Sequence, residues 1–285
     1  MNDKQTLFLS KAFTAWECPR KFHWIYNLWL APKEESPALR RGRIAHSISA
    51  TASRLRQKGL DRDTALALGI AEDKEIMQIT EDERAEISGH VFAIWDKIQD
   101  RKVTEVEKVL TFNPDYPWIW KGRVDFIEEE NGFWIGEIKT TSSYSSTIQR
   151  LYHKGIQPWV YLYIFTKLYQ ERARGIRMYV SSRPSREAQK ALGIPPGIQY
   201  CTVEEIPIQE HMLEYAWKFM MDSASYISGL DVNLQNRSAC QTFMGECPYL
   251  LLCDPHVTPE SLHFQDLVTQ MFKKEDPEEH LREEG

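Results

Sequence analysis

Two β-rich runs that meet at an Asn-Gly turn constrain the fold of this chain more than any other feature. The runs "WIWKGRVDFIEE" (118–129) and "GFWIGEIKTT" (132–141) stand on either side of this turn, at Asn131 and Gly132. Asn-Gly favours the positive φ angles of a tight hairpin, so the two runs are predicted to pair as antiparallel strands. A third run, "TEVEKVLTF" (104–112), precedes them across the turn signal "NPDYP". A β-sheet is therefore expected at the centre of the fold.

Helical patterns surround these strands. Helices are expected over 11–17, 37–59, 62–77, 81–100, 147–172 and 209–228, and further strands over 175–182 and 199–208. Ser10 is expected to cap the first helix, and Gly59 is expected to end the second. Strands enclosed by helices predict an α/β or α+β sandwich.

The length of 285 residues fits one large domain or two small ones. We expect one domain over 1–255, consisting of a mainly helical part (1–100), a core (103–206) and a helix followed by a cysteine-rich segment (207–255). Residues 271–285 hold six acidic and three basic residues. The segment 256–285 is therefore expected to be an acidic, flexible tail.

The chain shows no signal for a membrane or for export. Its longest apolar run, "WVYLYIF", has seven residues, whereas a membrane span needs roughly 18–20. The N-terminus lacks a basic start followed by an apolar stretch, so no secretory signal is expected. We therefore expect an intracellular, cytoplasmic protein. In that reducing setting, clustered cysteines bind metal more often than they form disulfides.

Acidic residues on the two hairpin strands suggest metal chemistry. The hairpin can place Asp125 and Glu137 side by side, and two such carboxylates repel each other unless a cation separates them. Oxygen ligands suit Mg²⁺ or Mn²⁺, and Lys139 shares the strand face of Glu137 because side chains alternate along a strand. A metal between two carboxylates, with an ammonium group beside it, can hydrolyse a phosphodiester. The alternative is a surface ion pair between Glu137 and Lys139, with no catalytic role.

Three further residues carry groups that could join this chemistry. His46, one turn after Gly42 on a predicted helix, could supply a third ligand that favours Mn²⁺. Gln157 and Tyr161 are four residues apart on another predicted helix, so they share a face and could bond a phosphate or a base. The alternatives are a structural histidine and an ordinary helix surface or core edge.

The charge of the chain is uneven. The net charge is −6, yet residues 11–56 carry nine Lys and Arg against three acids, and residues 147–190 carry nine against two. Two basic blocks on an acidic chain could form a phosphate-binding surface, and they could equally be ordinary solvated faces. Aromatic residues within the blocks, Trp24, Tyr26, Trp29, Tyr152, Trp159, Tyr161 and Tyr163, could stack unpaired bases or pack in a core.

The motifs "GRIAH", "GRVD", "EIK" and "QPWVY", in this order, resemble those of RecB-type nucleases of the PD-(D/E)xK superfamily. The resemblance covers roughly residues 8–255 and implies a restriction-endonuclease-like core, in which helices flank a mixed central sheet. It makes His46, Asp125 and Glu137 metal ligands, together with the backbone carbonyl of Ile138. Lys139 would be the catalytic lysine. Gln157 and Tyr161 would belong to the shell of the active site that contacts DNA.

Four cysteines fit a subset of this family. Cys240, Cys247 and Cys253 lie within "CQTFMGECPYLLLC", and Cys18 lies in "WECPRKF". From the residues alone these cysteines could hold iron, hold zinc or be buried thiols. They resemble the one N-terminal and three C-terminal cysteines of CRISPR-associated spacer-acquisition exonucleases and their phage relatives, and this resemblance implies a structural 4Fe–4S cluster. Cys201, in a predicted strand, is expected to be a core residue.

The predicted function is a metal-dependent deoxyribonuclease that acts on single-stranded DNA ends as an exonuclease and carries a 4Fe–4S cluster. One alternative is a non-catalytic subunit that binds or processes DNA ends within a recombination, repair or CRISPR adaptation complex. Another is a cluster-bearing RNA nuclease. The expected partners are DNA and proteins of such a complex, with no membrane.

Overall fold

The computed structural model describes residues 5–114, 117–141, 155–183, 190, 193, 198–242, 245–254, 257 and 260–279. Its chain divides into two compact units. Unit 1 comprises Met1–Glu35, Thr111–Gly122 and Trp217–Gly285, and unit 2 comprises Ser36–Leu110 and Arg123–Ala216. Among the described residues, no helix is long and apolar enough to cross a membrane.

Three helices at the start of unit 2 confirm three of the predicted ones. They are α3 (Pro37–Gln57), α4 (Arg62–Glu72) and α5 (Glu81–Ile98). Ser36 caps α3 through its side chain, Gly59 follows the helix with φ 91°, and Thr80 and Glu83 form a capping box on α5. The helix predicted over 62–77 ends earlier than expected. The Asp73 carboxylate accepts bonds from the next backbone N–H groups and so replaces the helical pattern.

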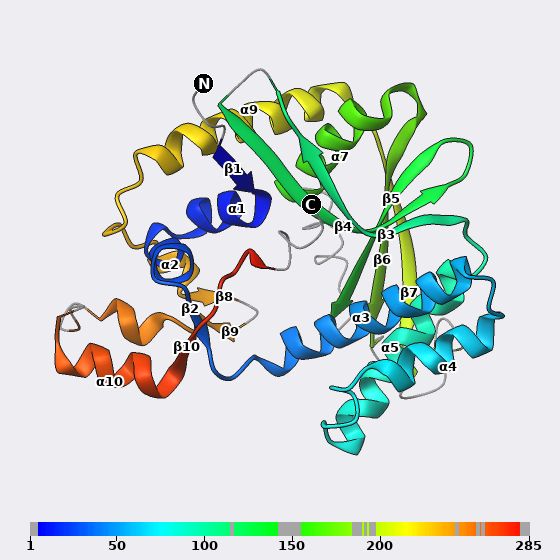
Figure 1. The fold of residues 1–285 in the computed structure, drawn as a ribbon, viewed down its shortest axis with the longest axis horizontal. Coiled ribbons are helices and arrows are strands. Elements are labelled where there is room, and N and C mark those ends of the chain that lie inside the picture. Colours follow the sequence, from blue (N-terminus) through cyan, green and yellow to red (C-terminus); the bar gives the residue numbers. More distant parts are fainter. Residues whose placement is uncertain are drawn as a thin grey trace. The chain divides into compact units, whose positions relative to one another are not determined.

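A mixed β-sheet runs through unit 2 and confirms the predicted sheet (Figure 1). Its strands are β3 (Val103–Phe112), β4 (Trp118–Glu129), β5 (Phe133–Thr141), β6 (Ala173–Ser182) and β7 (Tyr200–Pro207). β4 pairs with β5 in antiparallel fashion through the turn at Asn131 (φ 51°) and Gly132 (φ 126°). β5 and β6 are parallel, and β6 and β7 are antiparallel. The first residues of β4 pair in parallel with β1 (Gln5–Phe8) in unit 1.

The core of unit 2 lies between the sheet and helices α3, α4 and α5. Phe126 and Ile138 are fully buried in it, together with Tyr179 of β6 and Cys201 of β7. The position of Cys201 agrees with the prediction of a core residue. The next helix, α7 (Ile156–Tyr169), contacts β5 and β6. It ends before the predicted position 172, since Gln170–Arg172 forms a 3₁₀ turn. Residues 147–154 of that predicted helix lie outside the described part of the chain.

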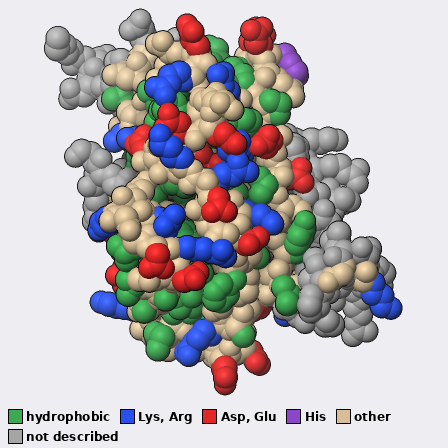
Figure 2. All heavy atoms as spheres, turned by 90° about the vertical axis from the view of Figure 1, so that its right-hand side faces the viewer, with side chains coloured by type: hydrophobic (Ala, Val, Ile, Leu, Met, Phe, Trp, Pro, Cys, Tyr) green, Lys and Arg blue, Asp and Glu red, His purple; other side chains and the backbone are tan. Residues whose placement is uncertain are grey.

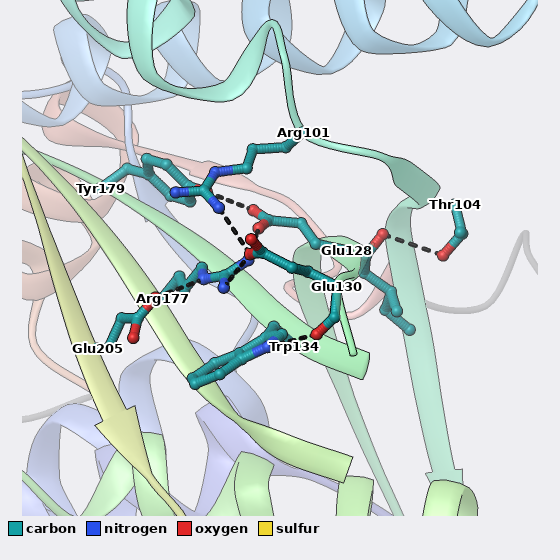
Figure 3. Close-up of polar contacts among 9 residues, drawn as sticks. Arg101, Thr104, Glu128, Glu130, Trp134, Arg177, Tyr179 and Glu205 are labelled. Carbon is teal, nitrogen blue, oxygen red and sulfur yellow. Dashed lines mark hydrogen bonds and ion pairs between the residues drawn. The ribbon is translucent and has the colours of Figure 1, made fainter. Parts of the chain in front are cut away.

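An ionic network around buried side chains joins three strands of the sheet, β4, β6 and β7 (Figure 3). The Arg177 guanidinium on β6 donates to Glu128 on β4 (3.1 Å) and to Glu205 on β7 (2.9 Å), and it also pairs with Glu130. The Tyr179 hydroxyl donates to Glu128 at 2.6 Å. Glu128 and Arg177 are 1% and 4% exposed, so neither charge can be left unpaired without a large desolvation penalty.

Unit 1 begins with β1, which continues directly into α1 (Leu9–Glu17). The prediction that Ser10 caps this helix is wrong, because Ser10 lies inside it and Phe8 is the N-cap residue. Phe8 is tied to β4 by strand pairing, so the strand and not a capping side chain sets where the helix begins. The other elements of the N-terminal segment are α2 (Pro19–Phe22), a π-helical turn (His23–Asn27) and β2 (Leu30–Pro32).

The C-terminal part of unit 1 folds against its N-terminal part. Its elements are α9 (Glu210–Ser228, which starts in unit 2), short turns at Arg237–Ala239 and Leu250–Cys253, β8 (Gln241–Thr242), β9 (Gly245–Glu246), α10 (Leu262–Met271) and β10 (Phe272–Lys274). β10 pairs with β2, and Phe264 and Phe272 join the cluster around Trp24. Residues 262–274 of the expected flexible tail are thus folded. The predicted division at residue 255 stays a prediction.

Candidate active site

The two hairpin strands separate beside the predicted acidic residues. The pairing of β4 with β5 extends from Glu129↔Phe133 to Phe126↔Gly136, whereas β5 continues beside β6 to its end at Thr141. Asp125 is the next residue of β4 and Glu137 the next residue of β5. Backbone groups at this point of β4 are no longer matched by β5, so side chains can enter the space between the strands.

Asp125 fills this space and contacts two other elements. Its Oδ1 lies 3.0 Å from Nδ1 of His46 on α3, and its Oδ2 accepts a bond from the Ile138 backbone N–H at 2.6 Å. The structure thus brings together the predicted His46, Asp125 and Ile138. Ile138 contributes its N–H to this contact, while its side chain is buried in the core.

Glu137 and Lys139 lie on one face of β5, as their spacing predicted. Lys139 Nζ is 2.5 Å from Glu137 Oε1. The side chains are 12% (Glu137) and 23% (Lys139) exposed, so this ion pair is partly buried. The pair is shielded from solvent, where charges interact more strongly than on an exposed surface.

The electrostatics of these groups are shared. Burial acts to raise the pKa of Asp125, but the neighbouring His46 ring and Lys139 outweigh it and lower that pKa. Burial acts to lower the pKa of His46, and Asp125 more than offsets this, so the pKa of the ring is raised. Burial is also the main reason that the pKa of Glu137 is raised; Lys139 opposes this shift and Asp125 adds to it. The charged form of Asp125 is therefore favoured by its neighbours, while burial disfavours the charged form of Glu137, a penalty that a bound cation could relieve.

Gly42 explains how α3 reaches the sheet at this point. A Cβ at Gly42 would lie 3.2 Å from Oγ1 of Thr140, the residue after Lys139. A larger residue would therefore need the Thr140 side chain or α3 to shift by a few tenths of an ångström. Since His46 is one helical turn further along α3, this close approach also brings its ring to Asp125.

Gln157 and Tyr161 share a face of α7, and Gln157 Nε2 lies 3.4 Å from the Tyr161 hydroxyl. Burial is the main reason that the pKa of Tyr161 rises to about 12, and the charge of Glu137 adds to it. The electrostatic influence of Glu137 places this hydroxyl near the acidic residues. Tyr161 is 9% exposed, so it is part of the wall of the site and not an exposed platform for base stacking.

The donor types fit a divalent cation. Two carboxylates and an imidazole suit Mn²⁺ or Mg²⁺. These donors face protein partners here: Asp125 faces His46 and Ile138, and Glu137 faces Lys139. In the described residues no group of three or more His, Cys, Asp and Glu side chains is gathered closely enough to hold a metal ion. Binding a cation would require Lys139 to turn away from Glu137 and free its carboxylate.

The four cysteines of the predicted cluster all lie in unit 1. Cys18 is buried, and Cys240, Cys247 and Cys253 are partly exposed. The Cys247 N–H donates to the Cys240 carbonyl at 2.9 Å. Burial raises the pKa of the Cys247 thiol, and the nearby thiols of Cys253 and Cys240 add to that shift. The charges of the other two C-terminal thiols thus reach Cys247, but in the described part of the chain no three of these cysteines lie close enough together to hold a metal ion.

The segment around Cys18 bonds to the C-terminal segment. Asn236 Nδ2 donates to the Glu17 carbonyl at 2.7 Å, and the Arg20 N–H donates to the Leu234 carbonyl at 3.1 Å. Lys21 influences the pKa of Cys247. The structure thus brings the two ends of the chain together, although the sequence separates them by more than two hundred residues.

Three arginines at the start of α3 form ion pairs with glutamates that lie outside the basic block 11–56. The pairs are Arg40–Glu83 (2.5 Å), Arg41–Glu86 (3.6 Å) and Arg43–Glu75 (2.5 Å). Their partners come from residues 73–98, outside the basic block 11–56. Figure 2 likewise shows both signs of charge interspersed over the face that it draws. Residues 147–154 and 184–189 of the second basic block lie outside the described residues.

Residues 9–254 match the sequence profile of the PD-(D/E)XK nuclease superfamily. The chain belongs to the PD-(D/E)XK nuclease superfamily. The crystal structure of a "Putative exonuclease" from Eubacterium rectale is similar to this superfamily member, with 14% identity and a TM-score of 0.53 over 93% of each chain. At this identity the likeness shows a shared fold. The crystal structure of SSO0001 has 16% identity and a TM-score of 0.33, covering 75% of this chain and 86% of its own. A search of curated proteins found no match.

The PD-(D/E)XK pattern finds a counterpart at the fork between β4 and β5. Asp125 follows Val124 where the pattern has proline, and Glu137, Ile138 and Lys139 stand as the (D/E)XK triplet. Nucleases of this superfamily generally use Mg²⁺ or Mn²⁺. Membership of the superfamily is thus confirmed, and the narrower resemblance to iron–sulfur RecB-type nucleases stays a prediction.

Proposed function

We propose that this superfamily member is a metal-dependent deoxyribonuclease that hydrolyses single-stranded DNA from its ends. The observation that carries this proposal is the meeting of Asp125, Glu137 and Lys139 in a shielded site where β4 and β5 separate. Two carboxylates and an ammonium group in this arrangement suit the hydrolysis of a phosphodiester. The preference for single strands and free ends rests on the RecB-type motifs. The E. rectale protein that shares the fold is named a "Putative exonuclease", which agrees with cleavage from an end.

Each residue of the site has a role in this proposal. His46, Asp125, Glu137 and the Ile138 carbonyl would hold Mn²⁺ or Mg²⁺, and the cation would supply a bound water of lowered pKa. Lys139, once released from Glu137, would orient that water or neutralise a phosphate oxygen, because its amine stays charged beside the carboxylates.

The helix α7 would complete the wall of the site. The partly exposed Gln157 amide would bond a phosphate or a base, and the buried Tyr161 hydroxyl would fix that amide through the bond between them. The Ile138 N–H would hold the Asp125 carboxylate in place, as it does at 2.6 Å in the structure.

A substrate panel tests the proposed activity. Purified protein is incubated with end-labelled single-stranded DNA, duplex DNA and RNA, each with Mg²⁺, Mn²⁺ or EDTA. We expect shortening of single-stranded DNA from one end with either metal and none with EDTA. Binding to DNA ends with no cleavage under any condition would identify a DNA-end-binding subunit of a recombination, repair or CRISPR adaptation complex. Preferential cleavage of RNA would identify an RNA nuclease.

We further propose that Cys18, Cys240, Cys247 and Cys253 hold a structural 4Fe–4S cluster. The bonds that hold residues 17–20 against residues 234–236 support this, because they bring the segment of Cys18 to the segment that leads into Cys240. Four thiolates suit an iron–sulfur cluster, and zinc is the main competitor. A metal clip between the two ends of the chain would stabilise unit 1, because the binding energy of a structural metal is largely folding energy.

Iron analysis of anaerobically purified protein tests the cluster. We expect a brown protein with about four irons per chain. Cys18→Ser should lose the iron as completely as Cys247→Ser, and the matched control Cys201→Ser should keep it, because Cys201 lies in the core of unit 2. Zinc without iron would replace the cluster with a zinc site. Iron kept in Cys18→Ser but lost in Cys201→Ser would overturn the ligand assignment.

A further inference from the structure

Glu107 adopts a backbone conformation that is unusual for a residue inside a strand. Its φ is 51°, and in the described residues the other non-glycine positions with positive φ are Trp29, Asn131 and Gln170. Asn131 forms the hairpin turn, Gln170 follows the end of α7, and Trp29 precedes β2. Glu107 lies within β3. A left-handed conformation at a side chain of this kind costs on the order of 1–3 kcal/mol, and such strain clusters at functional sites.

The unusual φ changes the direction of the Glu107 side chain. Glu105, two residues earlier, accepts a bond from the Tyr169 hydroxyl on α7 at 2.7 Å. In a regular strand Glu107 would point to the same side as Glu105. Instead it contacts Arg54 on α3, with 2.9 Å between Oε2 and Nη2. A local irregularity of this type is a common way to redirect one side chain of a strand.

Glu107 thereby bridges two elements of the candidate site. Its other oxygen, Oε1, lies 3.6 Å from Nη2 of Arg123 on β4. Arg54 is two helical turns after His46 on α3. Arg123 is two residues before Asp125, on the same side of β4. One carboxylate therefore connects the helix that carries His46 to the strand that carries Asp125.

Overall stability does not account for this arrangement. The three side chains are 22% (Glu107), 45% (Arg54) and 34% (Arg123) exposed. Partly exposed ion pairs contribute little to folding, about 0–1 kcal/mol each. The strain at Glu107 offsets that gain. Glu107 thus gives the fold little net stability, yet it joins the helix and the strand that carry His46 and Asp125. A role in arranging the candidate site explains its strained conformation better than a role in stability does.

We propose that Glu107 is a positioning residue that holds α3 against β4 and so keeps the His46 ring at Asp125. This inference rests on the proposed function for its effect on cleavage. Its structural content, the contact between His46 Nδ1 and Asp125 Oδ1, can be measured without metal or DNA. No pattern in the sequence predicted this role, because it depends on one backbone angle.

Glu107→Gly separates positioning from stability. Glycine adopts a φ of about 51° freely, so the variant loses the carboxylate and relieves the strain. Glu129→Gln is the matched control, because Glu129 also bridges two bases, Lys102 at 2.6 Å and Arg172 at 3.5 Å, at the far end of β4. Both variants are compared with the wild type in thermal midpoint, Mn²⁺ affinity without DNA, and single-turnover cleavage of single-stranded DNA.

We expect Glu107→Gly to keep or raise the thermal midpoint, while its Mn²⁺ affinity and cleavage rate fall by up to about 30-fold, the scale that the loss of two partly exposed ion pairs allows. Glu129→Gln should match the wild type in all three. A fall in thermal midpoint that accounts for the lost activity would make Glu107 structural and overturn the proposal. So would wild-type Mn²⁺ affinity in Glu107→Gly.

Proton magnetic resonance of the metal-free protein gives the direct readout. The His46 Nδ1–H, held by a carboxylate, should give a downfield signal that His46→Gln removes. We expect Glu107→Gly to lose or broaden this signal and Glu129→Gln to keep it. An unchanged signal in Glu107→Gly refutes the positioning role whatever the enzyme does to DNA. If the wild type cleaves nothing but the signal behaves as expected, the proposed function fails and the positioning role stands.

Discussion

His90 should make the stability of unit 2 fall sharply in mild acid. The ring is 2% exposed on α5, and its Nδ1 lies 2.8 Å from the Ser181 hydroxyl on β6. Burial is the main reason that its pKa is lowered to about 4, and the charges of Arg41 and Arg183 contribute. His90→Gln removes the titrating group and keeps an amide that can bond Ser181.

The magnitude follows from proton linkage. In the unfolded chain His90 binds a proton near the ordinary histidine pKa of about 6.5. In the folded protein it binds that proton only near pH 4. The contribution of a neutral His90 is therefore fully present above pH 6.5 and is lost as the pH falls towards 4. These two values give a loss of about 2 kcal/mol between pH 7 and pH 5, and about 3 kcal/mol by pH 4.

Urea unfolding of the wild type and His90→Gln at pH 7, 6 and 5 measures this loss. Other groups titrate in both proteins, so the difference between their pH profiles isolates His90. We expect the variant to be less stable at pH 7, because Gln fills the site less well, and the gap to narrow by about 2 kcal/mol at pH 5. Parallel profiles for the two proteins would refute the reasoning, because His90 would then titrate alike in the folded and unfolded states.

Two further substitutions test the surroundings of the site. Arg177→Met leaves the Glu128 carboxylate buried without its ionic partner, so the free energy of unfolding should fall by about 3–5 kcal/mol. A loss below about 1 kcal/mol, measured by urea unfolding, would contradict the importance of this pair. Gly42→Ala adds a methyl group 3.2 Å from Thr140 Oγ1 and improves helix propensity by about 1 kcal/mol. It should therefore keep the thermal midpoint but slow single-turnover cleavage, and wild-type cleavage would show that the close approach of α3 is not needed.

Local signals predicted much of the fold of unit 2. The hairpin turn at Asn131 and Gly132 and the caps of α3 and α5 act within a few residues, so the sequence displays them directly. Ser10 failed as a cap because β1 pairs with β4, more than a hundred residues away. The folded part of the expected tail escaped prediction for the same reason, since β10 pairs with β2 across most of the chain.

Part of the candidate site could likewise be predicted from local patterns, and part depends on the assembled fold. Glu137 and Lys139 were predictable because alternation along one strand decides that they share a face. The contact of His46 with Asp125 needs the approach of α3 at Gly42, which only the assembled fold shows. The charge count left a phosphate-binding surface and ordinary solvated faces open. The acidic partners of Arg40, Arg41 and Arg43 lie outside the counted block, so only the fold shows that these arginines are paired.

The most direct test of the central claim is cleavage measured beside binding for alanine variants of the site. Asp125→Ala, Glu137→Ala and Lys139→Ala are each compared with the wild type for cutting and for binding of the same single-stranded DNA with Mn²⁺. The account predicts that each variant loses cleavage but retains most of its DNA binding. Each substitution removes a group that activates the attacking water, while the remaining surface that contacts DNA is unchanged. Full cleavage by Glu137→Ala would contradict the claim that this site performs the hydrolysis.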